Sequence, residues 1–119
     1  MHAEFRITPE GKVLPIEVNP MRFAGYCTTD ISHYAFGFNG YEHLFLQKQP
    51  DWDTVFEGKE DKVFGMSVID VRPHVKPHGI KSYDYGMLLE QFETPLHIRK
   101  FDYKKYPVFG FVFAEIMGD

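Results

Sequence analysis

Cysteine is scarce in this chain, because Cys27 is the only one among 119 residues. A single thiol excludes an internal disulfide and a zinc site built from several cysteines, and it suits a reducing cytosol. No apolar run approaches the roughly 18 residues that a membrane helix needs. The first residues, MHAEFR, also lack the basic and then apolar pattern of a secretory signal. We therefore expect a cytoplasmic protein that does not enter a membrane.

Basic residues are also few. Thirteen Lys and Arg face seventeen Asp and Glu, which gives a net charge of −4. Residues 1–60 hold nine acids and five bases, whereas residues 61–119 hold eight of each, so the acidic excess lies in the first half. A nucleic-acid-binding protein usually shows a basic patch or stripe. The charge pattern therefore predicts no nucleic-acid partner.

The sequence does have enough apolar residues for a folded core. Hydrophobic residues make up 44% and charged residues 25%, close to globular averages. The size scaling predicts that a chain of this mass buries about two-thirds of its unfolded surface. With 12 Phe and 7 Tyr, we expect an aromatic core in one domain or a piece of one.

Two segments near the start alternate apolar and polar residues with a period of two, which is typical of half-buried β-strands. They are residues 3–8 (AEFRIT) and 13–18 (VLPIEV). Between them, residues 9–12 (PEGK) have the composition of a turn, because proline restricts φ and glycine permits positive values. The pattern predicts a β-hairpin with a four-residue turn and a core face formed by Phe5, Leu14 and Ile16.

Short helices are expected after the hairpin. One begins at Asp30 as its N-cap, and a second begins after Asn39 and runs to about Lys48. The helical period of the second predicts burial of Tyr41, Leu44 and Phe45. Residues 51–56 add a further turn of helix.

The second half predicts a strand–helix–strand–strand order, after a charged link at residues 57–61. The strands are expected at 62–71, 95–101 and 106–117, and the helix at 82–92. The predicted fold class is α+β. Segment 1–56 is expected to pack with segment 62–119 as one compact unit.

The hairpin brings acidic residues together. A turn at 9–12 pairs Thr8 with Val13, Arg6 with Pro15 and Glu4 with Glu17. Residues directly opposite have Cβ atoms about 5 Å apart, and like charges there are destabilising. Asn19 emerges on the same side as Glu17, two residues further on. Two carboxylates and an amide oxygen suit Mg²⁺ or Mn²⁺, which would remove the repulsion. The alternative is that both acids simply occupy the solvent face of a hairpin.

A longer string of residues resembles a known family. Glu4-Phe5, Gly11-Lys12 and Ile16-Glu17-Val18-Asn19-Pro20, followed by Arg22 and Gly25, resemble the C-terminal metal-binding segment of ATP-grasp enzymes. The resemblance covers residues 3–26. It implies that Glu4 and Glu17 bind magnesium, that Glu17 bridges two ions, and that Asn19 completes the second. It also implies that Arg22, with Asn19, lies on the side of bound ATP and reaches the transferred phosphate or the acyl phosphate. The family usually has Asn-Pro-Arg, so Arg22 comes one position late here.

The resemblance also implies a reaction. ATP phosphorylates a carboxylate, and an amine or another nucleophile attacks the acyl phosphate, releasing ADP and phosphate. A complete ATP-grasp unit is much longer, and its earlier lobes supply the phosphate-binding lysines and the adenine pocket. We therefore expect this chain to be the C-terminal part of a ligase, inactive alone. Its expected partners are the missing N-terminal lobes and a small carboxylate substrate.

Residues 108–113 (VFGFVF) are apolar on both faces of a predicted strand. Such a strand must be covered on both sides or it associates. Either the local helices cover it or it forms a homodimer interface. A second hypothesis about function follows, in which the chain is a small non-catalytic α+β binding or oligomerisation module and its aromatic residues mark a partner surface.

Overall fold

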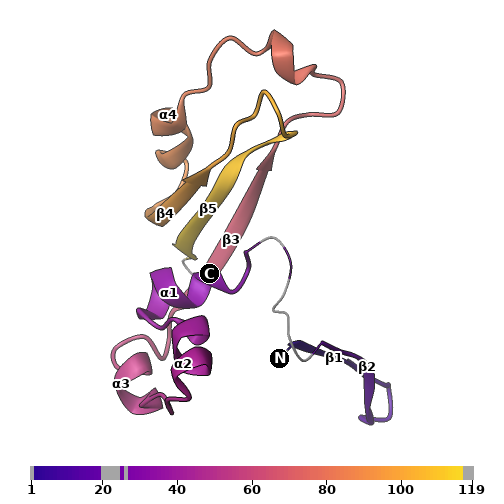
Figure 1. Ribbon diagram of the computed structural model, residues 1–119, viewed down its shortest axis with the longest axis vertical. Coiled ribbons are helices and arrows are strands. Elements are labelled where there is room, and N and C mark those ends of the chain that lie inside the picture. Colours follow the sequence, from indigo (N-terminus) through magenta and orange to yellow (C-terminus); the bar gives the residue numbers. More distant parts are fainter. Residues whose placement is uncertain (1, 20–24, 26, 117–119) are drawn as a thin grey trace.

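The computed structural model describes residues 2–19, 25 and 27–116. The chain is α+β, as predicted: an N-terminal antiparallel hairpin is followed by short helices and a three-stranded sheet (Figure 1). The order of elements is β1 (His2–Ile7), β2 (Val13–Asn19), α1 (Asp30–Phe36), α2 (Gly40–Leu46), α3 (Trp52–Phe56), β3 (Val63–Asp70), the 3₁₀ helix η1 (Pro77–Gly79), α4 (Tyr85–Leu89), β4 (Thr94–Lys100) and β5 (Val108–Ile116).

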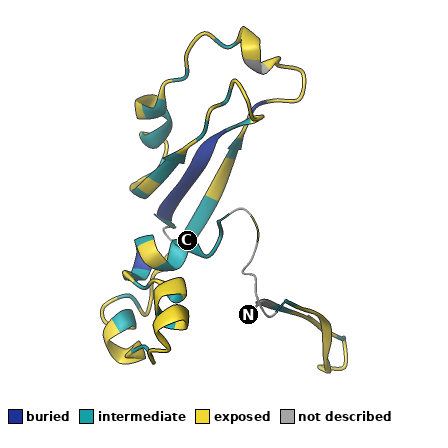
Figure 2. Ribbon diagram, in the orientation of Figure 1, coloured by how far each residue is buried: buried dark blue, intermediate teal, exposed yellow. Residues whose placement is uncertain are grey.

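The core lies along β5. The sheet has the order β3-β5-β4, and both neighbours run antiparallel to the central strand. Phe109, Phe111, Val112, Phe113 and Ala114 are buried, and Figure 2 shows this strand as the main buried element. Of the two possibilities for the VFGFVF segment, the structure has the local one, because the chain's own elements cover it. The apolar pattern of β5 therefore explains the core, and not an exposed interface.

Helix α1 covers one end of the sheet. Its Tyr34 ring stacks on the His97 ring of β4 at 4.1 Å between centroids, and it lies 4.8 Å from the ring of Phe113. Phe36 makes an edge contact with Phe64 of β3 at 5.0 Å. Ala35, between them in sequence, is 7% exposed. The period of this helix therefore places its aromatic residues on all three strands of the sheet.

Aromatic residues also close the opposite end of β5. The ring of Tyr83 stacks on that of Phe109 at 3.8 Å, and the hydroxyl of Tyr85 donates to the carbonyl oxygen of Phe109 at 2.9 Å. The side chain of Asp84 accepts from two amides of the first turn of α4. Burial raises the pKa of the Tyr83 phenol, as expected for a ring held against the core. The helix is shorter than the predicted range of 82–92, because Asp84 is its N-cap and Glu90 is its C-cap.

Helix α2 corrects a prediction of burial. Its predicted cap is confirmed, since the Asn39 side chain accepts from the amides of Tyr41 and Glu42. However, Tyr41, Leu44 and Phe45 are 43%, 55% and 80% exposed. The reason is the side by which α2 is attached. The ring of His43 packs on that of Phe38 at 4.8 Å. The polar side of the helix, which carries His43, therefore faces the rest of the molecule.

The hairpin lies apart from the other elements (Figure 1). The strands β1 and β2 pack on each other, whereas α1 packs on β3, β4 and β5. The radius of gyration is 17.7 Å, against about 13.5 Å for a compact chain of this length. The accessible surface is 9298 Å², against about 6,700 Å² from the size scaling. The chain thus exposes about 2,600 Å² more than a compact monomer of its mass. The division into segments 1–56 and 62–119 stays a prediction.

Candidate functional site

The turn of the hairpin is one residue longer than predicted. Ile7 pairs with Val13, so the connection runs from Thr8 to Lys12. The amide of Thr8 donates to the Lys12 carbonyl at 2.9 Å, and the amide of Gly11 donates to the Thr8 carbonyl at 2.9 Å. Gly11 has a φ of +78°, which glycine adopts without the strain that a Cβ causes. The predicted pairing of Thr8 with Val13 is therefore wrong.

A β-bulge restores the predicted pairing of the acids. Phe5 lies opposite Pro15, whereas Glu4 lies opposite Glu17, so Ile16 is the extra residue in β2. The bulge follows Pro15, which has no amide to donate to a ladder, and prolines inside sheets are found at such irregular positions. The predicted pair of Arg6 with Pro15 is wrong. The predicted pair of Glu4 with Glu17 is confirmed.

The longer turn also changes the composition of the two faces. Arg6 now lies opposite Leu14, and residues that pair directly share a face, so Leu14 belongs with the charged side chains and not with Phe5. The predicted core face of Phe5, Leu14 and Ile16 is therefore wrong. These three side chains are 56%, 48% and 59% exposed.

Three predicted ligands lie together at the open end of the hairpin. Glu4 and Glu17 are cross-strand neighbours, and the side-chain nitrogen Nδ2 of Asn19 donates a hydrogen bond to Oε1 of Glu17. Asn19 is half-buried, and its own partner across the strands is His2. The fourth predicted residue, Arg22, lies outside the described residues. The structure thus brings together the two carboxylates and the amide.

The donor set of this end fits a small hard cation in part. Carboxylate and amide oxygens are the ligands that Mg²⁺ takes, usually together with waters and phosphates. The hydrogen bond uses the amino group of Asn19, so its carbonyl oxygen points elsewhere. A cation shared with Glu17 requires this amide to rotate by about half a turn, because only the oxygen can coordinate. Among the described residues, no group of three or more His, Cys, Asp or Glu could hold a metal. Two carboxylates are therefore the acidic complement available here.

A carboxylate at the opposite end of the hairpin has a different surrounding. A hydrogen bond from the side chain of Thr8 and one from the backbone amide of Glu10 itself lower the pKa of Glu10 below its ordinary value. This group is fully exposed and belongs to the turn, away from the pair of Glu4 and Glu17.

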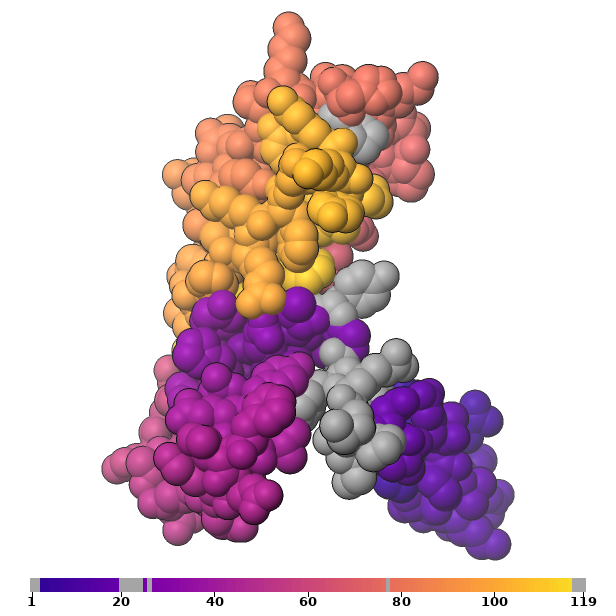
Figure 3. All heavy atoms as spheres, viewed as in Figure 1, coloured from indigo at the N-terminus to yellow at the C-terminus, as the bar shows by residue number. Residues whose placement is uncertain are grey.

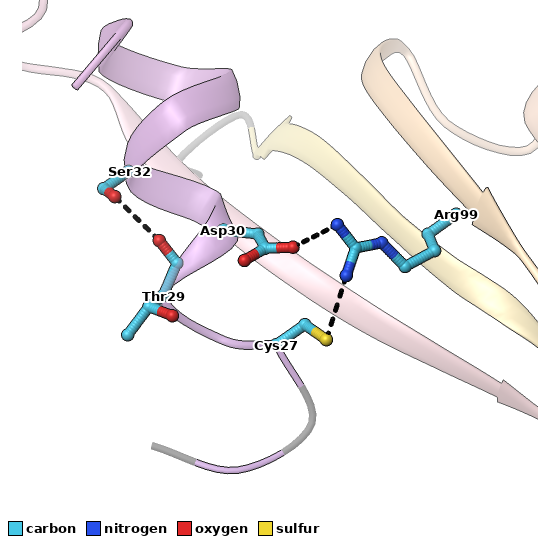
Figure 4. Close-up of polar contacts among 5 residues, drawn as sticks. All are labelled: Cys27, Thr29, Asp30, Ser32 and Arg99. Carbon is cyan, nitrogen blue, oxygen red and sulfur yellow. Dashed lines mark hydrogen bonds and ion pairs between the residues drawn. The ribbon is translucent and has the colours of Figure 1, made fainter. Parts of the chain in front are cut away.

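A second polar cluster joins the start of α1 to β4 (Figure 4). Arg99 forms an ion pair with Asp30, and its Nη1 lies 3.0 Å from Sγ of Cys27. Burial lowers the pKa of the Arg99 guanidinium, but the hydrogen bond with Tyr34 and the charges of Asp30 and Cys27 together raise it. The Ser32 hydroxyl donates to the Thr29 carbonyl at 2.7 Å, closing the first turn. Arg99 therefore fixes a loop residue and a helix terminus to the sheet.

This cluster borders a cavity of about 370 Å³ between α1, the start of α2 and β4. Its wall includes the side chains of His33, Tyr34, Phe38, Tyr41 and Arg99. The sequence pattern indicates no partner for Cys27 and does not single out Arg99. No local signal could have found the contact, because the two residues are 72 positions apart and meet only through the packing of α1 on β4.

Comparison with known proteins relates the start of the chain to one family. The family model of the ATP-grasp domain matches residues 1–30. This is about a quarter of the chain, and it contains the hairpin with Glu4, Glu17 and Asn19. No curated protein and no solved structure matches the chain. The relationship to ATP-grasp domains thus rests on this N-terminal segment.

One further structural feature concerns membranes. Within the described ranges, no helix has both the length and the apolar character required to cross a bilayer.

Proposed function

We propose that this chain supplies the cation-binding hairpin of an ATP-dependent carboxylate ligase of the ATP-grasp type. The observation that carries the proposal is the pairing of Glu4 with Glu17 across the strands, with Asn19 bonded to Glu17. These three residues lie inside the segment that the ATP-grasp model matches. Carboxylate and amide oxygens together are the ligands that Mg²⁺ takes in proteins, usually with waters and phosphates.

In this proposal each residue has one role. Glu4 and Glu17 would hold Mg²⁺ or Mn²⁺ from facing strands, and Glu17 would be shared between two ions. Asn19 would complete the site with its side-chain carbonyl oxygen, which requires it to give up the hydrogen bond to Glu17. Bound cations would neutralise the phosphate oxygens of ATP during transfer to a carboxylate. Arg22 stabilises the charge on the transferred phosphoryl group or the acyl phosphate.

The proposal includes partners. The lysines that hold phosphate and the pocket for adenine come from N-terminal ATP-grasp lobes, and the acceptor is a small carboxylate. We expect the chain without those lobes to be inactive as a ligase and to act in the cytoplasm. The exposed apolar residues of the hairpin support a covering partner, since an isolated two-stranded hairpin is at best marginally stable in water.

The test uses Mn²⁺ as a paramagnetic probe of the hairpin. Amide resonances of the labelled chain are recorded during titration with Mn²⁺, and Mg²⁺ is then added as a diamagnetic competitor. We expect broadening at Glu4, Glu17 and Asn19 that Mg²⁺ reverses. The turn residues Thr8 and Lys12, at the far end of the strands, should broaden much less.

Two variants make this test specific. Glu17→Ala/Asn19→Ala should abolish the broadening, whereas Glu10→Ala removes an acid from the same hairpin and should leave it unchanged. Absence of broadening at the open end, or broadening that survives the double substitution, would show that these residues hold no cation. A repeat with ATP present tests the nucleotide separately, because nucleotide contacts come mainly from the other lobes.

One observation favours a second candidate function. Phe45 is 80% exposed and Leu44 is 55% exposed on a well-formed helix, as expected for a non-catalytic binding or oligomerisation module. If the cation test fails while the chain associates, this second function replaces the first.

A further inference from the structure

The three-stranded sheet has two edge strands, β3 and β4, and they differ in how well they are protected against pairing with another chain. Natural edge strands avoid such pairing through prolines, bulges and charged side chains. The strand β4 has all three features, with Pro95, a bulge at Leu96, and the charges of Arg99 and Lys100. The edge of β4 therefore offers no regular row of backbone groups to a further strand.

The strand β3 lacks these features over residues 63–69 (VFGMSVI). This stretch has no proline and no charged residue, and the bulge in its pairing with β5 lies on the β5 side, at Phe109. Val63 and Val68 are 54% and 39% exposed. In Figure 1, β3 runs along the outer side of the sheet, with β5 between it and β4. A long, regular and apolar edge of this kind is a template for pairing.

The described elements around β3 leave its outer side free for such pairing. In Figure 3, helices α2 and α3 form one end of the molecule, the loop that contains η1 forms the other, and the sheet lies between them. Helix α1 packs against a face of the sheet, where the ring of Phe36 meets that of Phe64 at 5.0 Å. Within the described ranges, β5 is the element that pairs with the backbone of β3.

The sequence of this edge is complementary to itself when read in the opposite direction. Two copies of β3 related by a two-fold axis run antiparallel, and the axis passes between two identical residues. With Met66 at the axis, residues of similar character face each other: Val63 and Ile69, Phe64 and Val68, Gly65 and Ser67. Lys62, just before the strand, then lies opposite Asp70 of the other copy. Lys62 contacts Glu115 of its own chain at 2.9 Å, and an ammonium group has three donors, so it can reach both acids.

We propose that β3 is the interface of a two-fold homodimer, in which the β3 strands of two copies of this chain pair antiparallel with Met66 at the axis. The two sheets then join into one sheet of six strands, which is an ordinary size. Main-chain hydrogen bonds hold the two copies together, as when an extended strand adds to the edge of a sheet. The facing side chains add cross-strand contacts. The contact is closed, because the same edge serves on both sides.

The charges beside the strand select this register. A two-fold antiparallel pair can slide only in steps of two residues, since a slip of one residue turns every side chain to the other face. Continued past the strand ends, a slide in one direction places Asp70 opposite Glu60, and a slide in the other places Lys62 opposite Arg72. Both alternatives bring like charges together, which is destabilising. The register centred on Met66 brings opposite charges together instead.

Sedimentation equilibrium of the full chain over a wide concentration range tests the dimer. We expect a monomer–dimer equilibrium that Val68→Lys weakens by about tenfold, because the substitution puts a charge on the edge and occurs twice in a symmetric interface. Thr94→Lys is the matched control, since it adds the same charge at an exposed position of the opposite edge strand. It should leave the dissociation constant nearly unchanged. Circular dichroism verifies that each variant keeps its fold.

Disulfide cross-linking tests the register. Cys27→Ser first removes the single native thiol. In that background, Met66→Cys should form an intermolecular disulfide under mild oxidation, because residues directly opposite each other have Cα atoms about 4.5–5.5 Å apart, within the range of a disulfide. Val68→Cys should not cross-link, because its two copies would lie about 13 Å apart along the strands. Non-reducing electrophoresis measures both.

Three outcomes would each overturn the proposal. They are a chain that stays monomeric at every concentration, a dimer that Thr94→Lys weakens as much as Val68→Lys, and cross-linking by Val68→Cys in place of Met66→Cys. If Val68→Lys fails to fold, the cross-linking pattern decides the matter. Glu4 and Glu17 lie outside this interface, so the result is independent of the cation test.

Discussion

The described residues form two antiparallel sheets, and the two differ in burial. In the sheet β3-β5-β4, the central strand pairs on both edges and has five buried apolar residues. In the hairpin β1-β2, none of the residues 3–19 is buried, although both strands alternate as core strands do. Figure 2 shows the contrast between a buried central strand and a hairpin exposed on both strands. A period-two pattern thus identifies a strand, but the number of neighbouring strands and helices decides whether that strand is buried.

The difference also separates two uses of apolar surface. The apolar side chains of β5 find partners within the chain, from α1 at one end and from Tyr83 at the other. The apolar side chains of the hairpin and of α2 remain exposed and are available to other molecules. We therefore expect substitutions in β5 to change the free energy of unfolding, and substitutions in the hairpin or α2 to change binding.

The largest expected effect on the free energy of unfolding is at Phe113, in the centre of the buried sheet. Phe113 is fully buried, at 0% exposure, whereas Phe5 on the hairpin is 56% exposed. Phe113→Ala should lower the free energy of unfolding by about 3–5 kcal/mol, because it removes apolar contacts and leaves a cavity. Phe5→Ala should lower it by less than about 1 kcal/mol. Chemical denaturation followed by circular dichroism measures both. Equal losses would mean that the hairpin contributes to the same core.

A smaller effect tests how closely the strands of the buried sheet approach. A Cβ on Gly110 of β5 would lie 2.7 Å from the carbonyl oxygen of Arg99 on β4, and backbone cannot move aside easily. Gly110→Ala should therefore destabilise the chain by about 1–3 kcal/mol, as overpacking does. Gly79→Ala is the matched control, because a Cβ there meets nothing within 4 Å. The same denaturation assay applies. A neutral Gly110→Ala would show that β4 can separate from β5.

The link between α1 and the sheet predicts a further, lesser loss. Arg99 holds Asp30 and Cys27, and its side chain is 39% exposed, so solvent screens much of the attraction. Arg99→Ala should cost about 1 kcal/mol, and a double-mutant cycle with Asp30→Ala should give a coupling of about 0.5 kcal/mol or more. Lys105→Ala, an exposed cation in the turn before β5, should cost almost nothing. A coupling near zero would assign the loss to packing alone.

The sequence predicted the class of fold and the order of its elements, because hydrophobic period and capping residues act locally. The pair of Glu4 and Glu17 was also predicted, but through two errors that cancelled. The turn is one residue longer than expected, and the bulge at Ile16 shifts the register back. A bulge beside Pro15 depends on which ladder amides find partners, and alternation alone does not contain that information.

The remaining errors concern tertiary contacts. The helical period of α2 identifies its apolar side, and that side was assigned to the core. The ring contact between His43 and Phe38 instead fixes the orientation of the helix. The contact of Arg99 with Cys27 joins residues far apart in sequence, and neither residue has a local pattern that indicates it. Local chemistry therefore predicts the elements, whereas the direction in which an exposed helix faces depends on particular side-chain contacts that the helical period does not contain.

The smallest expected effect is a pH dependence confined to the hairpin. Hydrogen bonds from the side chain of Thr8 and from the backbone of Glu10 itself lower the pKa of Glu10 below its ordinary value of 4.5. A carboxylate with a lowered folded-state pKa stabilises the turn above its unfolded pKa, and this contribution is lost as the pH falls through the folded value. The amide resonance of Thr8 should therefore shift as the pH is lowered below about 4.5, whereas amides of β5 should not respond. Glu10→Gln should remove the dependence. If the β5 amides shift together with that of Thr8, protonation of Glu10 affects both sheets. The hairpin and the buried sheet would then behave as one cooperative unit.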